Sequence, residues 1–301
     1  MRADRVVLRT AREHLAEAGL DASILVRDLR SGRELALDAD VPYPLASVVK
    51  LPLALTVLRS ATAGRLDLAR PVELRPDTRT PGPTGISRFQ HSAVVAVEDL
   101  LYLALAVSDD TAADALFALC PPDLVTASLR QLGISTITVR HTIAELHRTL
   151  ASVLSPAERP QALSLAIAAA TTGGGHLIPQ LDVTSANAGT ARGLADLLEL
   201  IWTDDRLAEE RDRLRALLGA NLLRHRLAPD LESDEAAWFS KTGTFLHLRH
   251  EAGVVGHSDG TSIAVVVLSR SNVPARVQPA AEQALGHVAR LLHDQVRATA
   301  S

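Results

Sequence analysis

Lysine is rare in this chain, and both lysines stand in short motifs that could carry out acyl-transfer chemistry. Of 31 lysine and arginine residues, only Lys50 and Lys241 are lysines. Arginine stays protonated in proteins, whereas a buried lysine can lose its proton and act as a base. Lys50 ends the sequence Ser-Val-Val-Lys that begins at Ser47, and Lys241 begins the sequence Lys-Thr-Gly. An arginine-biased composition would also leave two scattered lysines, but these positions favour the site of a nucleophilic serine.

A nucleophilic serine needs a nearby base, a proton path to the leaving group and donors for the developing oxyanion. Ser47 stands at the start of a predicted helix, and Lys50 follows one turn later on the same face. The sequence Ser-Asp-Asp at 108–110 follows an apolar helix, and Lys-Thr-Gly at 241–243 lies in a predicted strand. Each motif alone occurs by chance in many proteins. The three together, in this order and in these settings, predict a catalytic centre.

With these motifs the chain resembles the class A β-lactamases and penicillin-binding proteins, which carry Ser-x-x-Lys, Ser-Asp-Asn and Lys-Thr-Gly. The likeness covers most of the chain and looks like the actinobacterial type of β-lactamase-related serine hydrolase. It implies a class A β-lactamase-like fold of α/β plus all-α type. In that fold an antiparallel sheet is flanked by the terminal helices, a helical domain is inserted, and the site lies in the cleft between them. The segments that carry the likeness are residues 44–50, 108–114, 222–224 and 241–244.

The resemblance also implies a role for each motif residue. Ser47 would be the nucleophile and Lys50 its base. Ser108 would relay a proton to the leaving group, and Lys241 would hold Ser108 and raise the local positive potential. The backbone N–H groups of Ser47 and Thr244 would form the oxyanion hole, where one donor is typically worth about 3 kcal/mol of barrier. The substrate-binding residues would be Asp110, Thr242, Gly243, Arg249 and His250, with Thr242 and a cation at 249 or 250 directed at a substrate carboxylate; for Arg249 an edge-strand ion pair with Glu251 is the alternative.

Two departures from the class A pattern bear on the substrate and on turnover. Asp110 stands where the lactamases have asparagine, and an ionised carboxylate cannot donate a hydrogen bond. Asp110 would therefore repel the side-chain carbonyl of a β-lactam unless it is protonated or salt-bridged. The glutamate that activates the deacylating water has Ile143 in its place, and the asparagine that follows it has His147. Glu145 is two positions away and could serve only in a shifted loop, so the candidates for deacylation are Glu145 and His147.

A third departure is a longer stretch before Lys241. The extra residues fall at about 151–180, next to the cleft, and the three glycines at 173–175 would allow this segment to move. An insertion here could cover or reshape the pocket. The expected domains are an α/β domain formed by residues 1–45 and 222–301, and a helical domain formed by residues 46–221 that carries the first two motifs.

Composition excludes several other classes of function. A formal charge of −4 with both signs mixed gives no basic stripe, which argues against nucleic-acid binding. No apolar run reaches the length of a membrane span, and the start has no apolar stretch of signal-peptide length, so we expect a cytoplasmic protein. His247 and His250 are three residues apart on a predicted strand and would face opposite sides. We therefore expect no metal and no cofactor, and a small-molecule acyl substrate that carries a carboxylate.

These observations favour a serine hydrolase that cleaves an ester or amide through acyl-Ser47 and is not an efficient β-lactamase. Three alternatives remain open. The protein could be a true class A β-lactamase with Glu145 as the deacylating base. It could transfer an acyl group to an acceptor other than water in specialised metabolism. It could also be a non-catalytic binding protein on this scaffold.

Overall fold

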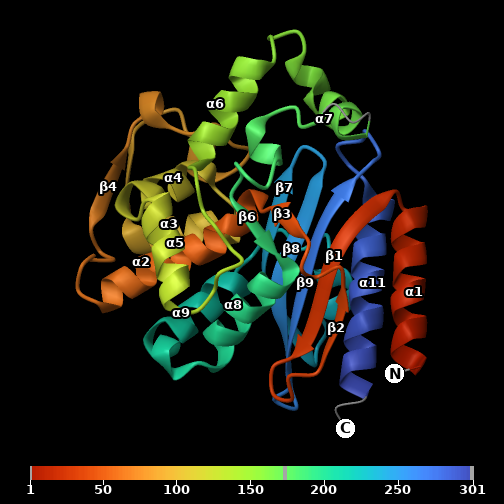
Figure 1. The fold of residues 1–301 in the computed structure, drawn as a ribbon. Helices are drawn as coiled ribbons and strands as arrows, with labels where there is room; N and C mark the ends of the chain where they lie inside the picture. Colours follow the sequence, from red (N-terminus) through yellow and green to blue (C-terminus); the bar gives the residue numbers. More distant parts are fainter. Residues whose placement is uncertain (1, 172–174, 299–301) are drawn as a thin grey trace.

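A five-stranded antiparallel sheet, built from the two ends of the chain, forms the centre of the computed structural model (Figure 1). The structure describes residues 2–171 and 175–298. The strand order is β2-β1-β9-β8-β7, so the first strands pair with the last one. The three final strands follow one another as hairpins. The strands are β1 (Leu20–Asp28), β2 (Glu34–Leu37), β7 (Ala236–Phe245), β8 (Leu248–His257) and β9 (Ser262–Ser271).

Both faces of this sheet are covered, as the alternation along β9 shows. Val265 and Val267 pack with the terminal helices, whereas Val266 packs on the opposite face. Successive side chains of a strand point to opposite faces, so an unbroken apolar strand needs a layer on each side. Figure 1 shows the two terminal helices side by side along one face. The covering helices are α1 (Arg2–Glu17) and α11 (Pro279–Ala298) on one face and α8 (Ala191–Thr203) on the other.

Helix α8 belongs by sequence to the predicted helical domain (46–221) but packs against β1 and β9 of the sheet. Arg27 on β1 fastens it there, because its guanidinium pairs with Asp196 at 2.7 Å and with Glu199 at 2.6 Å. The domain boundaries stay a prediction. The predicted arrangement, an antiparallel sheet flanked by terminal helices with a helical part inserted, is confirmed.

The inserted part is organised around α2 (Lys50–Thr62), in which ten of 13 residues are buried. A helix that is apolar all round needs neighbours on every side, and α2 contacts four other helices. The helix predicted to begin near Ala46 starts with a 3-10 turn, η1 (Ala46–Val49), before the α-helix proper. The remaining helices of this part are α3 (Val97–Ala106), α4 (Asp110–Leu119), α5 (Pro122–Gln131) and α9 (Ala208–Gly219); the short α10 (Ala228–Leu231) lies beside α11.

The α6–α7 segment, residues 143–171 and 175–187, begins with α6 and α7, which lie at the top of Figure 1 beyond the rest of the molecule. The segment contains α6 (Ile143–Val153) and α7 (Ala162–Thr171). Its own small core, including Leu146 and Ala166, packs onto Leu248 of β8 with Ala46 at its edge. The extra segment predicted at 151–180 therefore lies next to the turn that carries Ser47. Gly173 and Gly174 of the predicted flexible triplet lie outside the described residues.

Short strands and turns complete the fold. The pair β3 (Pro42–Pro44) and β6 (Ala188–Thr190) ties the residues before Ser47 to the end of the α6–α7 segment. Helices α5 and α6 and the four short strands were not anticipated from the sequence. Across the described residues no single helix is long and apolar enough to cross a membrane, although α4 and α5 together, bent by 72°, pass by length and composition. The other elements are β4 (Pro71–Leu74), β5 (Ala93–Ala96), η2 (Pro76–Thr78), η3 (Gly85–Arg88), η4 (Arg159–Gln161), η5 (Pro179–Leu181) and η6 (Asp205–Leu207).

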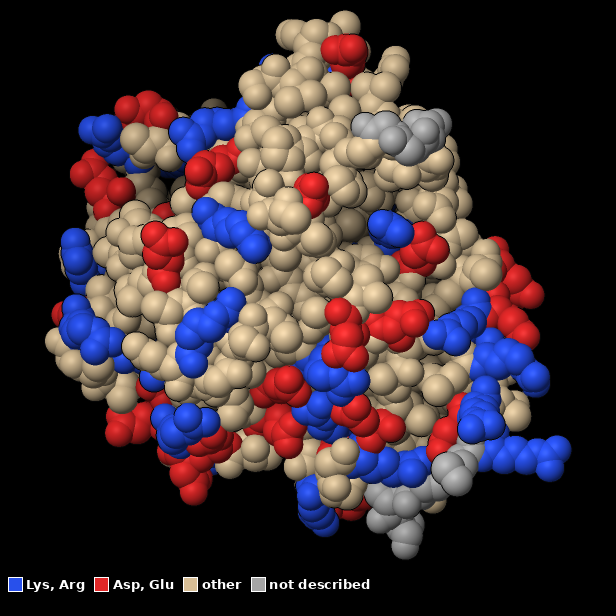
Figure 2. All heavy atoms as spheres, viewed as in Figure 1, with Lys and Arg blue, Asp and Glu red and all other residues tan. Residues whose placement is uncertain are grey.

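The charges on the face seen in Figure 2 are of mixed sign. Positive and negative side chains alternate over it, and few charges lie over its upper part, where the α6–α7 segment projects. This face carries no continuous stretch of one sign.

Candidate active site

Ser47 lies in the turn η1, half-buried, at the point where the chain enters α2. The preceding residue, Ala46, has a φ of +46°, which an L-residue adopts only when its surroundings impose it. Leu45 is fixed by a hydrogen bond of 2.7 Å from its N–H to the carbonyl of Asn187. No described residue forms a hydrogen bond with the Ser47 hydroxyl. The side chain predicted to be the nucleophile is thus held on a constrained turn with its oxygen uncommitted.

Lys50 is completely buried one turn after Ser47, and its amino group is surrounded by acceptors. Nζ donates to the Ser108 carbonyl at 2.7 Å, to Ser108 Oγ at 3.3 Å and to Asp110 Oδ1 at 2.7 Å. The first two motifs are therefore in direct contact through Lys50.

Lys241 reaches the same serine from the sheet. It is completely buried on β7, and its Nζ lies 3.0 Å from Ser108 Oγ and 2.8 Å from the Thr242 carbonyl. Burial, followed by repulsion from Lys50, lowers the pKa of Lys241 well below its usual range. Ser108 itself has a φ of +58°, so the backbone here is also constrained. All three motifs thus meet at one hydroxyl group, that of Ser108.

The two unusual residues Asp110 and His147 are partners in the structure. His147, on α6, donates from Nε2 to Asp110 Oδ2 at 3.3 Å, while Asp110 Oδ1 faces Lys50. Burial raises the pKa of the Asp110 carboxyl, but the charge of Lys50 and the hydrogen bond from His147 outweigh it, so this pKa lies below its ordinary value. Asp110 is therefore a salt-bridged carboxylate. The sequence predicts repulsion of a substrate carbonyl unless Asp110 is protonated or salt-bridged, and the second condition is met.

Glu145 serves a different purpose from the one the sequence allowed for it. Its Oε2 accepts hydrogen bonds from the N–H and hydroxyl of Thr142 at 2.7 and 3.1 Å, and the pair forms a capping box at the start of α6. Among the described residues it has no bond to Ser47, Lys50 or Asp110. The suggestion that Glu145 activates a deacylating water is therefore corrected, because its carboxylate is used to cap a helix.

Ile143 occupies the position of the missing glutamate and is buried. It lines a small cavity together with Ala46, Leu146, Phe245 and Leu248, and the polar residues His141, Gln180 and Asn187 also line this cavity. Ala46 is adjacent to the nucleophile, and among the described residues no carboxylate lines the cavity.

Arg249 and His250 are both committed elsewhere. His250 is completely buried: its Nε2 donates to the Pro44 carbonyl at 2.8 Å, and its Nδ1 accepts from Ser269 N–H at 3.0 Å. Burial lowers its pKa to about 3, so the ring is neutral and holds the strand before Ser47. Arg249 donates to the Leu246 and Leu248 carbonyls at 2.6 and 2.8 Å. The prediction that these residues bind a substrate carboxylate is corrected, because neither side chain has a donor directed at the site.

The third motif fits closely against the nucleophile's turn. A Cβ atom on Gly243 would lie 2.9 Å from the Leu45 carbonyl oxygen and 3.1 Å from Val48 N, so only glycine lets β7 approach η1 this far. The two segments that carry the expected oxyanion donors, Ser47 N–H and Thr244 N–H, therefore lie side by side. Thr242 is buried, and its hydroxyl has no hydrogen-bond partner among the described residues.

Arg226 and Asp109 are two residues of this region that sequence reasoning missed. Arg226 is buried, donates to Thr244 Oγ1 at 3.2 Å and pairs with Glu282. Nothing in the sequence distinguishes it from the many other arginines. Asp109 is buried and caps α4 by accepting from Thr111 N–H at 2.9 Å. Its place before a helix start was a readable capping signal.

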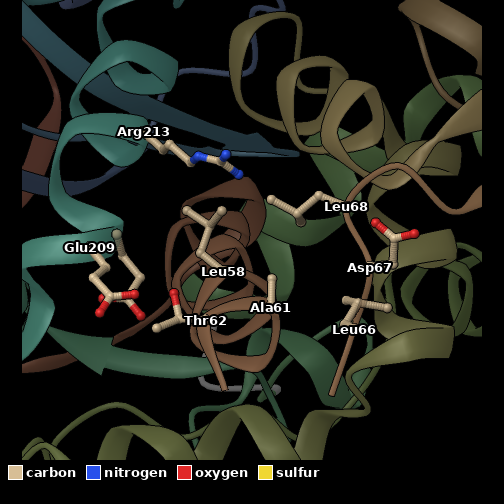
Figure 3. Close-up of a pocket in the computed structure, with 9 residues that line it drawn as sticks. Leu58, Ala61, Thr62, Leu66, Asp67, Leu68, Glu209 and Arg213 are labelled. Carbon is tan, nitrogen blue, oxygen red and sulfur yellow. The ribbon is translucent and has the colours of Figure 1, made fainter. Parts of the chain in front are cut away.

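A separate cavity of about 370 Å³ lies at the other end of α2 (Figure 3). Leu58 and Ala61 of α2 line it, together with Leu66 and Leu68 of the following loop and Arg213 of α9. Leu58 is eight residues beyond Lys50, so the cavity lies roughly 12 Å farther along the helix axis. It does not belong to the serine site. Throughout the described parts of the chain, no three His, Cys, Asp or Glu residues are placed to hold a metal ion.

Comparison with known proteins agrees with this geometry. The β-lactamase enzyme family matches residues 8–296. A relative from Streptomyces cacaoi, named β-lactamase regulatory protein BlaB, is 52% identical over 304 residues, which cover 97% of each chain.

Two groups of solved structures share the fold at low sequence identity. An ancestral class A β-lactamase is 23% identical with a TM-score of 0.76 and covers 96% of this chain and 99% of its own. The penicillin-binding protein PBP-A is 17% identical with a TM-score of 0.74, over 97% and 96% of the two chains. The chain is therefore a member of the β-lactamase enzyme family, within the β-lactamase-like serine hydrolase superfamily.

Proposed function

We propose that this protein forms a covalent acyl enzyme at Ser47 from a small ester, amide or β-lactam and releases the acyl group slowly. It would then act as an acyl-transfer protein with low turnover and not as an efficient β-lactamase. The observation that carries this proposal is the contrast between a complete Lys50–Ser108–Lys241 centre and an apolar Ile143 where the deacylating glutamate would stand.

The acylation step has its components in place. Ser47 is uncommitted on its turn, Ser108 can carry a proton between the reacting atoms and a buried amine, and β7 runs beside the turn. Preorganised donors of this kind act where charge develops in the transition state. The unpaired hydroxyl of Thr242 is suited to a carboxylate on the substrate.

Slow deacylation follows from the opposite side of the site. Among the described residues no carboxylate lines the cavity beside Ile143 and Leu146, and Glu145 is occupied as a helix cap. General base catalysis typically contributes about 10²–10⁴-fold to a rate. Without a carboxylate in place, we expect acyl-Ser47 to persist.

A persistent adduct is suited to signalling. The 52% identical relative is named a β-lactamase regulatory protein, and a receptor must hold its ligand long enough for a second event to register it. We propose the same kind of role here, with acyl-Ser47 as the occupied state. The cytoplasmic location stays a prediction, which cell fractionation would check.

The test is intact-protein mass spectrometry over several hours after mixing with benzylpenicillin, with an aryl ester and with a D-alanyl-D-alanine peptide. We expect one adduct per chain with at least one compound, stable after removal of excess reagent, and none in Ser47→Ala. Rapid consumption of penicillin without an accumulating adduct would instead support the true β-lactamase. No adduct with any compound class, or the same adduct in Ser47→Ala, would overturn the proposal.

A further inference from the structure

The two lysines of the site are not equivalent, and the difference begins with Lys50. A lysine ammonium has three N–H donors and no acceptor. Lys50 Nζ has three acceptors within hydrogen-bond distance: the carbonyl and the hydroxyl oxygens of Ser108, and the carboxylate of Asp110. Every proton of the ammonium form is thereby used, and an anion lies 2.7 Å away. The surroundings of Lys50 match a charged amine.

Lys241 has different neighbours. Its Nζ contacts only two oxygens in the described structure, the Thr242 carbonyl at 2.8 Å and Ser108 Oγ at 3.0 Å, and it has no ion pair among these residues. A neutral amine fits both contacts, because it donates one N–H to the carbonyl and accepts the Ser108 O–H through its lone pair. Ser108 Oγ meanwhile accepts from Lys50.

Charged groups around Lys241 come from four elements. Lys50 on α2 and Asp110 on α4 lie on the helical side, Glu251 lies on β8, and Arg226 precedes α10. Glu251 does not pair with Lys241, because its carboxylate accepts from Trp238 Nε1 at 2.8 Å, Ser240 Oγ at 2.7 Å and the Leu227 N–H at 3.1 Å. Asp110 is shared by Lys50 and His147. The positive charge of Lys50 therefore acts on a buried amine that forms no ion pair with a carboxylate among the described residues.

We propose that Asp110 exchanges the roles of the two lysines: Lys50 is the permanent cation of the site, and neutral Lys241 takes the proton of Ser47 through Ser108. The proton transfer in this inference rests on the proposed function, whereas the charges of the two lysines do not. The lowered pKa of Lys241, caused first by burial and then by Lys50, agrees with it.

The proton movement balances over the acyl transfer. Ser47 Oγ bonds to the acyl carbon while its proton passes to Ser108 Oγ, and the proton of Ser108 passes to the lone pair of Lys241. The carbonyl π electrons move to the oxygen, which the backbone donors stabilise. When the tetrahedral intermediate collapses, the carbonyl re-forms, the bond to the leaving nitrogen or oxygen breaks, and the proton returns from Lys241 through Ser108 to that atom. Lys50 keeps its protons throughout and offsets the developing negative charge.

The chain's composition makes the decisive experiment simple. Only two lysines occur in the sequence, so protein labelled with ¹³Cε-lysine gives two side-chain signals, each of which reports the charge of one amine. The protein is prepared without lysine in any tag, and the signals are assigned with Lys50→Arg and Lys241→Arg. We expect the Lys241 signal to titrate at least about two pH units below that of Lys50, since burial can shift a lysine by several units.

Asp110→Asn should reduce or reverse the difference between the titration midpoints of the two lysine signals. Lys50 loses the carboxylate that lies 2.7 Å from its amino group, whereas Lys241, which Asp110 does not contact, loses only a longer-range attraction. The matched control is Asp114→Asn on the same helix, whose carboxylate is partly buried and binds the Ile143 and Ala144 N–H groups and, among the described residues, no lysine. It should leave both signals in place. Equal midpoints near the ordinary lysine value of about 10.4, or Lys50 titrating first in the unmodified protein, would overturn the proposal.

Kinetics supply a second readout. The rate of acylation at Ser47 should rise with pH through the midpoint measured for Lys241. Lys241→Arg, which cannot release its proton, should lower the rate at least about 100-fold, whereas Lys50→Arg should be the milder change because only charge is needed there. If both variants are folded and Lys50→Arg loses more of the acylation rate than Lys241→Arg, the proposed exchange of lysine roles would be contradicted. Absence of any adduct would overturn the proposed function while leaving the lysine charges to be judged by the titration.

Discussion

The two sides of the Ser47 site have departed from the family pattern to very different degrees. On one side, Lys50 of α2 and Lys241 of β7 both contact Ser108, and η1 holds Ser47 one turn before Lys50. On the other side, α6 presents Ile143, Leu146 and His147, where the class A pattern has a glutamate and an asparagine. In the proposed function the first side would attack an acyl carbon, and the second side would bring in water.

With the proposed function, this difference would make formation and breakdown of an acyl enzyme separable in one site. The attacking side is closely packed, since a Cβ atom on Gly243 would lie 2.9 Å from the Leu45 carbonyl oxygen. The water side belongs to a segment with a small core of its own around Leu146, although Ile143 packs in the main core. Asp110 joins the two sides, since it contacts both Lys50 and His147.

Removing the carboxylate of Asp110, which contacts both sides of the site, should have the largest effect. Asp110→Ala leaves the buried Lys50 without a carboxylate, and we expect the free energy of unfolding to fall by about 3–5 kcal/mol. Because the pKa of Asp110 is lower in the folded protein, the unfolded chain binds more protons in acid. The stabilisation by Asp110 is fully present at pH values above its pKa in the unfolded chain, which is about 3.9. It is lost as the pH falls through the lower pKa of the folded protein. Urea unfolding at several pH values should show that the difference in unfolding free energy between the unmodified protein and Asp110→Ala becomes smaller in acid. A gap that widens there would contradict the assignment.

The attacking side can be damaged alone with Gly243→Ala. Its Cβ would push β7 away from η1, so we expect acylation of Ser47 to slow by about 100-fold. Gly256→Ala on β8 is the matched control, because its Cβ would meet only the Phe239 ring at 3.3 Å. Stopped-flow or timed mass spectrometry of adduct formation measures the rate. Equal rates in the two variants would mean that the close approach of β7 has no role in acylation.

The water side can be rebuilt with Ile143→Glu. A carboxylate at this position should shorten the lifetime of acyl-Ser47 by about tenfold or more, less than a fully positioned base provides. Ile143→Gln has the same shape without the base and should leave the lifetime unchanged. Loss of the adduct is followed by mass spectrometry after excess reagent is removed. The same lifetime in both variants would show that a missing base is not what slows deacylation.

The smallest effect is expected from Glu145, which lies on the water side but caps a helix. Glu145→Ala should lower the free energy of unfolding by about 1 kcal/mol through loss of the capping box, and Glu145→Gln should largely restore it. Neither variant should change the lifetime of acyl-Ser47. A longer lifetime in both would restore Glu145 as a deacylating residue.

Much of the fold could be predicted because its signals are local. The apolar run of β9 and the capped helix α8 are determined by side-chain period and terminal residues. Helix α5 begins with Pro122 at its first position, which is a readable start signal. Helix α6 was missed although Thr142 and Glu145 form a readable capping box.

The sequence by itself determined the chemistry available to this protein: one serine, two lysines and a second serine, in motifs whose order identifies the family. Only the tertiary structure decided how these groups are used. Asp110 and His147 are 37 residues apart and became partners through packing of α6 against α4. His250 became a buried neutral ring, and Lys50 received the carboxylate that Lys241 lacks. Residue type and spacing define what a group can do, whereas its charge depends on burial and on neighbours that only the folded chain brings together.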